Sequence, residues 1–123
     1  MKTERRKFSR FLAQDTAFAV LRPTFSKVGK IKDISGGGLA FHYIGYDGQQ
    51  KDSSEMDIFL CEEGCFHLSK IPCKIIHDYK VDEYQTSIHR IETRRCGVEF
   101  RGLTEEQAAE LEFFLKNHTT GTA

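Results

Sequence analysis

The chain has 123 residues, of which 39% are hydrophobic and 29% charged, and its 18 Lys and Arg residues balance 18 Asp and Glu residues. This length and composition predict a single globular domain with its own apolar core. A net charge of zero argues against a protein whose whole surface binds polyanions, so any anion binding must be local. The longest apolar run, residues 17–21, is too short to span a bilayer, and no signal-peptide pattern follows the basic start. We therefore expect a cytoplasmic protein without a membrane segment.

Basic residues are concentrated at the start of the chain, where residues 4–10 read ERRKFSR and hold four positive charges. Residues 1–14 show neither helical nor alternating periodicity, and only Phe8, Phe11 and Leu12 can anchor them to a core. We predict a flexible basic segment over residues 1–14.

Beyond this segment, short stretches rich in β-branched and aromatic residues alternate with clusters of Gly, Asp, Ser and Pro, which is typical of an antiparallel all-β domain. In MDIFLCE, the residues Met56, Ile58 and Leu60 share one face, as a half-buried strand requires. Residues 46–55 lack apolar periodicity and are predicted to form a hairpin loop. Six or seven short strands favour a small barrel or sandwich. The strands are expected near residues 16–22, 27–34, 38–45, 56–61, 66–79, 84–91 and 95–101.

The last predicted element is a helix at about residues 104–117. Thr104 and Gln107 have the spacing of a capping box. Apolar residues recur at helical spacing, so the helix should pack on the mouth or side of the β-domain. This apolar face consists of Ala108, Leu111, Phe114 and Leu115. We place one domain over residues 15–118 and expect a frayed tail over residues 119–123.

Three consecutive glycines interrupt the strand pattern in KDISGGGLAF, residues 32–41. A run of glycines implies a backbone shape that side chains would block, because each glycine loses more backbone entropy on ordering than other residues do. Either a tight hairpin needs positive φ there, or a ligand approaches the main chain closely. Asp33 and Ser35 precede the glycines and lie two residues apart, so we expect their side chains on one face of a strand.

These residues and the basic segment suit an anion that carries guanine bases. The carboxylate of Asp33 can accept hydrogen bonds from the two adjacent donors of guanine, N1–H and the exocyclic amine. Arg6 and Arg10 are four residues apart, so one helical turn or a curved loop can aim both guanidinium groups at one phosphate or base. Arg5 adds a third guanidinium beside them.

The two motifs together resemble PilZ domains, which are bacterial receptors for cyclic di-GMP. RKFSR, residues 6–10, matches the R-x-x-x-R motif of that family, and DISGGG, residues 33–38, matches its [D/N]-x-S-x-x-G motif. CGVEFRGLTEEQAAELEFFL is similar to the family's last strand and C-terminal helix. The resemblance implies a mainly all-β fold, namely a six-stranded antiparallel β-barrel with a C-terminal α-helix and a flexible arginine-rich N-terminal segment that closes over the ligand.

The resemblance also implies roles for single residues. The arginines would contact phosphates and guanine faces, Asp33 and Ser35 a guanine edge, and Gly38 would allow close approach. In the family, an arginine directly before R-x-x-x-R accompanies the binding of two stacked ligand molecules, and Arg5 occupies that position. The implied protein is a non-enzymatic second-messenger receptor that acts through a separate downstream protein, and we expect no DNA partner. The ligand-binding residues are then Arg5, Arg6, Arg10, Asp33, Ser35 and Gly38.

Three alternatives remain open. The protein could be a PilZ-fold interaction adaptor that does not depend on a nucleotide, or the basic run could be a solvated tail. It could also be a small RNA-binding barrel whose basic residues neutralise phosphates. Against RNA binding, the sequence has no interleaved aromatic signature, and the nearest second basic patch, residues 89–95, is diluted by Glu92.

Cysteine and histidine residues form no recognisable metal or catalytic pattern. Cys61, Cys65 and His67 give C-x3-C-x-H rather than the close C-x2-C of most zinc ribbons, and no nearby cluster completes four ligands. We expect reduced thiols, with Cys61 and Cys96 as small core residues and a Cys61–Cys65 disulfide as a redox hypothesis only. Ser35 has no adjacent base to activate it. We therefore expect no catalytic residue, no metal and no cofactor other than the bound ligand.

Overall fold

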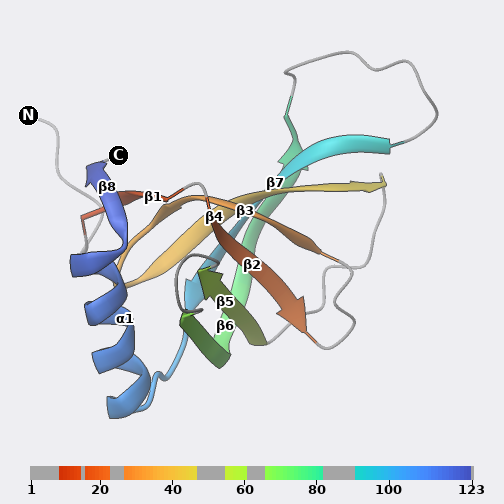
Figure 1. Ribbon diagram of the computed structural model, residues 1–123. Coiled ribbons are helices and arrows are strands. Elements are labelled where there is room, and N and C mark those ends of the chain that lie inside the picture. The colour runs from red at the N-terminus through yellow and green to blue at the C-terminus, as the bar shows by residue number, and fades with distance from the viewer. Residues whose placement is uncertain are drawn as a thin grey trace, which may run out of the picture.

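The computed structural model describes residues 9–14, 16–22, 27–46, 55–60, 66–81 and 91–122. This part of the chain contains eight strands and one helix (Figure 1). In chain order they are β1 (Phe11–Ala13), β2 (Ala17–Arg22), β3 (Val28–Ile34), β4 (Gly38–Tyr46), β5 (Glu55–Leu60), β6 (Phe66–Lys80), β7 (Ile91–Phe100), α1 (Glu105–Asn117) and β8 (Thr119–Thr122).

The pairing between β2 and β3 closes the sheet into a barrel. The antiparallel strands follow the order β2-β5-β6-β7-β4-β3, and the additional β2–β3 pairing completes a ring of six in the described part of the chain. One edge of β3 pairs with β4, and the other edge is shared, since residues 28–30 pair with β2 whereas Asp33 and Ile34 pair with β1. β1 and β8 extend the sheet beyond the ring. The expected six-stranded antiparallel barrel is confirmed.

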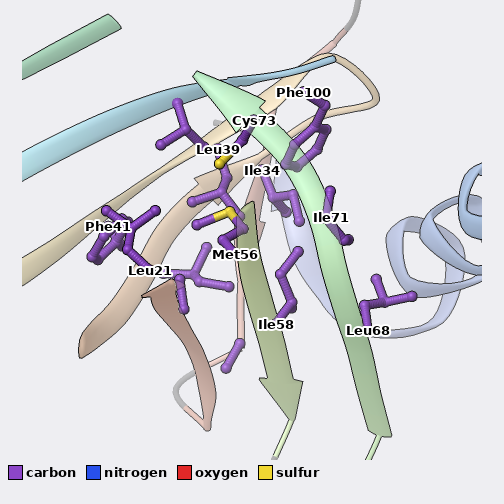
Figure 2. Close-up of a cluster of buried hydrophobic side chains, with 14 of the residues drawn as sticks. Leu21, Ile34, Leu39, Phe41, Met56, Ile58, Leu68, Ile71, Cys73 and Phe100 are labelled. Carbon is purple, nitrogen blue, oxygen red and sulfur yellow. The ribbon is translucent and has the colours of Figure 1, made fainter. Parts of the chain in front are cut away.

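Alternate residues of the strands point into the barrel and form one apolar core (Figure 2). Met56, Ile58 and Leu60 of β5 are buried, as the alternation in the sequence predicts. On the opposite side of β6, the β7 residues Cys96 and Val98 are buried in the same cluster. Each buried Leu, Ile or Met side chain stabilises the fold by about 1.5–3 kcal/mol, so this shared core holds the strands together.

The helix α1 packs beside the barrel (Figure 1). It begins after Thr104, whose hydroxyl accepts a hydrogen bond from the backbone N–H of Gln107 at 3.0 Å. The side chain of Gln107 accepts one from the backbone N–H of Thr104 at 3.1 Å, so the predicted capping box is confirmed. Phe114 is fully buried, and its ring centroid lies 5.6 Å from that of Phe66 at the start of β6. The expected packing of the helix on the β-domain is therefore confirmed.

The first turn of α1 differs from the prediction. Ala108 was expected on the buried face but is exposed. This turn contacts β6 through Gln107 instead, whose side-chain amide donates to the backbone carbonyl of Lys70 at 3.1 Å. At this edge of the helix the contact with β6 is therefore made by the polar side chain of Gln107, through two backbone carbonyls, and not by Ala108.

β7 is continuous over Ile91–Phe100, whereas the sequence predicts two strands, at residues 84–91 and 95–101, with a break between them. The first predicted strand falls mostly on residues 82–90, which lie outside the described residues. The predicted break is wrong because the charged side chain of Arg94 points inward and finds hydrogen-bond acceptors there. Its Nε donates to a carboxylate oxygen of Asp78 at 2.9 Å, so the strand continues through a polar position.

The two ends of the described chain also differ from the prediction. Residues 11–13 fall in the expected flexible segment, and residues 119–122 in the expected frayed tail. They form β1 and β8, which pair with each other, with Phe11 opposite Thr122. Residues 1–8 and the greater part of the predicted 46–55 loop lie outside the described residues. α1, the one helix in the described ranges, is not long and apolar enough to cross a membrane.

Candidate ligand-binding groove

A groove of about 410 Å³ lies where the turn between β3 and β4 meets β6 and β7. This volume falls within the range of about 300–1,000 Å³ that is typical of small-molecule sites. Asp33, Ala40 and Gly97 occupy matched positions on β3, β4 and β7. Their chain neighbours Ile34, Leu39 and Val98 are buried in the core, so this row faces outward. The polar side chains that line the groove are those of Arg10, Asp33, Ser35, His77, Arg95 and Glu99, and Gly38 lies among them.

Asp33 is paired with Arg95 across the groove. A terminal guanidinium nitrogen of Arg95 donates to Oδ2 of Asp33 at 2.9 Å. The Asp33 side chain is 14% exposed and that of Arg95 is 21% exposed. A carboxylate offers about four acceptor positions on its two oxygens, so Asp33 can bind a second donor while it keeps this ion pair.

Ser35 fixes the turn between β3 and β4. Its backbone N–H donates to the carbonyl of Gly38 at 2.8 Å, and its hydroxyl accepts from the N–H of Gly37 at 3.1 Å. The same hydroxyl lies 3.3 Å from the Gly38 carbonyl, to which it donates. Ser35 is almost completely buried, so its main contacts are with the turn itself. Because Ser35 lies past the end of β3, the expected pair of equivalent strand positions becomes one strand residue and one turn residue.

At Gly38, the last residue of the glycine run, a close approach of the main chain explains the glycine. In the described part of the chain, the positive-φ glycines are Gly102 and Gly121, so a positive-φ hairpin at residues 36–38 is wrong. A Cβ at Gly38 would instead collide with the backbone carbonyl oxygen of Val98 on β7. Glycine at position 38 therefore lets β4 and β7 come together beside the groove.

Arg10 is the described arginine of the basic segment that lines the groove. It lines the cavity together with Asp33, Ser35 and Gly38, although more than twenty residues separate it from them. The predicted contacts of Arg5 and Arg6 lie outside the described residues. Three further polar residues, His77, Arg95 and Glu99, line the groove but are not among the predicted site residues. Arg95 was visible only as part of a basic patch, and no local pattern marks the strand pairing that brings it to Asp33.

The cysteines in the described residues have no link to the groove chemistry. Cys73 and Cys96 are buried free thiols, and burial raises the pKa of Cys73 to about 11 and that of Cys96 to about 12. The described residues contain no cluster of metal-ligating side chains. Cys61 and Cys65, with the disulfide hypothesis that concerns them, lie outside those residues.

Fold and groove together define a small β-barrel domain with a ligand-sized groove, lined by both polar and apolar residues, on its outer face. The sequence model described as PilZ domain matches residues 4–117, and the chain belongs to the PilZ domain family. The resemblance found in the sequence is therefore confirmed at the level of the family. None of the curated proteins matches the chain.

Solved structures of PilZ proteins share this fold at low sequence identity. The PilZ domain of Escherichia coli YcgR, with c-di-GMP, is 15% identical at a TM-score of 0.68, with 94% of this chain and 92% of that chain covered. The crystal structure of E. coli YcgR in complex with c-di-GMP is 15% identical at a TM-score of 0.64, covering 92% of this chain and 45% of that one. The K. pneumonia MrkH–c-di-GMP complex is 16% identical at a TM-score of 0.63, covering 94% and 52%. This chain thus spans about half the length of the YcgR and MrkH chains in those two complexes.

Proposed function

We propose that this protein is a non-enzymatic receptor for cyclic di-GMP that binds the nucleotide in the groove between Arg10 and the β3–β4 turn. The observation that carries the proposal is the convergence of the two sequence motifs. Arg10 from the first motif and Asp33, Ser35 and Gly38 from the second line one cavity. Membership of the PilZ family and the c-di-GMP complexes of YcgR and MrkH support the same ligand.

The groove chemistry suits both parts of this ligand. The carboxylate of Asp33 accepts from N1–H and the exocyclic amine of one guanine, while Ser35 keeps the turn in shape at that edge. Arg10 binds a phosphate or stacks on a base, since a guanidinium group can do either. Arg6 provides a second guanidinium group for the ligand. Arg5 adds a third positive charge, which suits the binding of two stacked ligand molecules.

Binding becomes a signal when the arginine segment closes over the nucleotide. New charge-assisted hydrogen bonds offset the conformational entropy that the segment loses. The closed segment changes the surface beside the groove, and a separate downstream protein in the cytoplasm reads that change. Protection of the bonds after Arg5 and Arg6 from trypsin upon addition of cyclic di-GMP is the expected sign of closure.

Isothermal titration calorimetry with cyclic di-GMP tests the binding proposal. Wild-type protein should give saturable heat, and the variants Arg10→Ala and Asp33→Ala should each weaken binding by at least tenfold. Lys116→Ala is the matched charge control, because this exposed lysine lies on α1 and does not line the groove. Absence of heat from folded wild-type protein overturns the proposal and favours a nucleotide-independent adaptor. Tight RNA binding that depends steeply on salt and is unchanged by Asp33→Ala contradicts the proposal and favours an RNA-binding barrel.

A further inference from the structure

His77 occupies the part of the groove that neither sequence motif accounts for. It lies on β6 opposite Gly97 of β7, directly after a register shift between Ile75 and His77. A Cβ at Gly97 would collide with the imidazole ring, so glycine at position 97 lets the ring lie against the sheet. The ring of Tyr79 lies 5.3 Å away, centroid to centroid, and holds the imidazole on another side.

The imidazole has an unused hydrogen-bonding position. Nε2 of His77 is buried, and none of the described residues donates to it or accepts from it. A buried polar atom without a partner is unfavourable, because the atom has lost its hydrogen bonds to water. Because Nε2 is buried, a ligand atom reaches it only when the ring turns away from Gly97, and that contact then supplies the hydrogen bond that no described residue provides.

Charged groups on four parts of the chain act on this imidazole. Burial lowers the pKa of His77, and the positive charges of Arg95 on β7 and Arg10 before β1 lower it further. Asp78 on β6 and Asp33 on β3 act in the opposite direction without reversing the shift. The surroundings in the ligand-free protein therefore favour the neutral form of the ring.

We propose that His77 is a further ligand-binding residue, which contacts a phosphate of the bound nucleotide as an imidazolium, so that binding takes up a proton. This inference rests on the proposed function, because a phosphate diester supplies the negative charge. A phosphate placed near Arg10 and Arg95 offsets the positive charges that oppose protonation of His77. It also provides an acceptor for the Nε2–H of the protonated ring.

The direction of the pH effect follows from linkage. The ligand raises the pKa of His77 above its lowered value in the free protein. Affinity is therefore constant well above the bound-state pKa, increases as the pH falls through that value, and levels off below the free-state pKa. Each unit by which binding raises the pKa gives about a tenfold gain in affinity over this span.

Calorimetry with cyclic di-GMP at about pH 6, 7 and 8, in buffers of different ionisation enthalpy, measures affinity and proton uptake together. Wild-type protein should bind several-fold more tightly at the lowest pH and take up protons. His77→Gln keeps a hydrogen-bonding side chain but cannot titrate, so it should bind with little pH dependence and without that uptake. His118→Gln is the matched control, since His118 packs on Phe114 away from the groove and should retain wild-type behaviour.

A second variant keeps the test open if His77→Gln does not fold. Gly97→Ala displaces the imidazole through its Cβ and should lose the proton uptake in the same way. Saturable heat without pH dependence, or a His77→Gln variant that still takes up protons, overturns this inference and leaves the proposed function intact. Absence of heat at every pH overturns both.

Discussion

Arg95 of β7 and Asp33 of β3 form an ion pair that crosses β4, with a distance of 2.9 Å between guanidinium nitrogen and Oδ2. The residue of β4 in the row of Asp33 is Ala40, which is nearly buried and has too short a side chain to separate the pair. The Arg95 guanidinium orients the Asp33 carboxylate, which in our proposal accepts hydrogen bonds from guanine. We therefore expect Arg95 to act as a positioning residue for Asp33.

The substitution Arg95→Met should weaken cyclic di-GMP binding by about tenfold, because a hydrogen bond between charged groups contributes about 1.5–3 kcal/mol and 1.4 kcal/mol corresponds to a factor of ten. Calorimetry on a double-mutant cycle with Asp33→Ala checks the mechanism. If Arg95 acts through Asp33, the loss in the double variant is smaller than the sum of the two single losses. Fully additive losses would contradict the positioning role, and Lys116→Met controls for the loss of one positive charge.

The close approach at Gly38 predicts a stability effect. Gly38→Ala should lower the melting temperature by about 5–15 °C, because its Cβ meets the rigid carbonyl of Val98 and the strands must separate. Gly97→Ala should lower it less, because the Cβ there meets the side chain of His77, which can rotate away. Thermal unfolding followed by circular dichroism compares the two. Equal melting temperatures for Gly38→Ala and wild type would show that β4 and β7 can separate freely.

Local patterns in the sequence predicted those elements whose signals lie within a few residues of each other. The alternation at Met56, Ile58 and Leu60 and the capping box at Thr104 and Gln107 depend only on spacing along the chain, and both are confirmed. β1 and β8 could not be predicted in this way. Their short sequences become strands because they pair with each other across almost the whole chain.

The candidate site likewise contains residues that local sequence patterns predict and residues that they do not. Arg10, Asp33, Ser35 and Gly38 belong to compact motifs, and the structure places them around one groove. Arg95 becomes part of it only through the register of β3, β4 and β7, which sets it beside a residue 62 positions away. The reason for glycine at position 38 was equally hidden, because the atom that approaches it belongs to a distant strand.

Asp57 predicts how stability depends on pH. Although burial alone would raise its pKa, hydrogen bonds from Arg22, from the backbone N–H of Lys70 and from His67 together lower the pKa to about 2, from 3.8. The two Arg22 contacts are both 2.8 Å long, and the Asp57 side chain is 3% exposed. Because the folded-state pKa lies below the unfolded one, this stabilisation is complete above about pH 4 and disappears as the pH falls towards 2.

Asp57→Asn should therefore lower the free energy of unfolding by about 2 kcal/mol at pH 7 and flatten its decline between about pH 4 and pH 2. Urea unfolding at several pH values measures both effects. Glu112→Gln is the control, because this exposed carboxylate forms only a surface pair with Lys116 and should leave the curve unchanged. An Asp57→Asn variant as stable as wild type at pH 7 would mean that these hydrogen bonds contribute nothing net.

The adjacent residues Phe113 and Phe114 give an internal test of how α1 is attached to the barrel. Phe114 is completely buried against Phe66, whereas Phe113 is 52% exposed although its ring centroid lies 6.0 Å from that of Phe66. Phe114→Ala should lower the free energy of unfolding by about 3–5 kcal/mol, because it leaves a cavity between helix and barrel. Phe113→Ala removes the same atoms from the same helix and should lower it by about 1 kcal/mol or less, since half of that side chain already contacts water. Urea unfolding of both variants provides the comparison, and equal losses would contradict a helix that is anchored through Phe114.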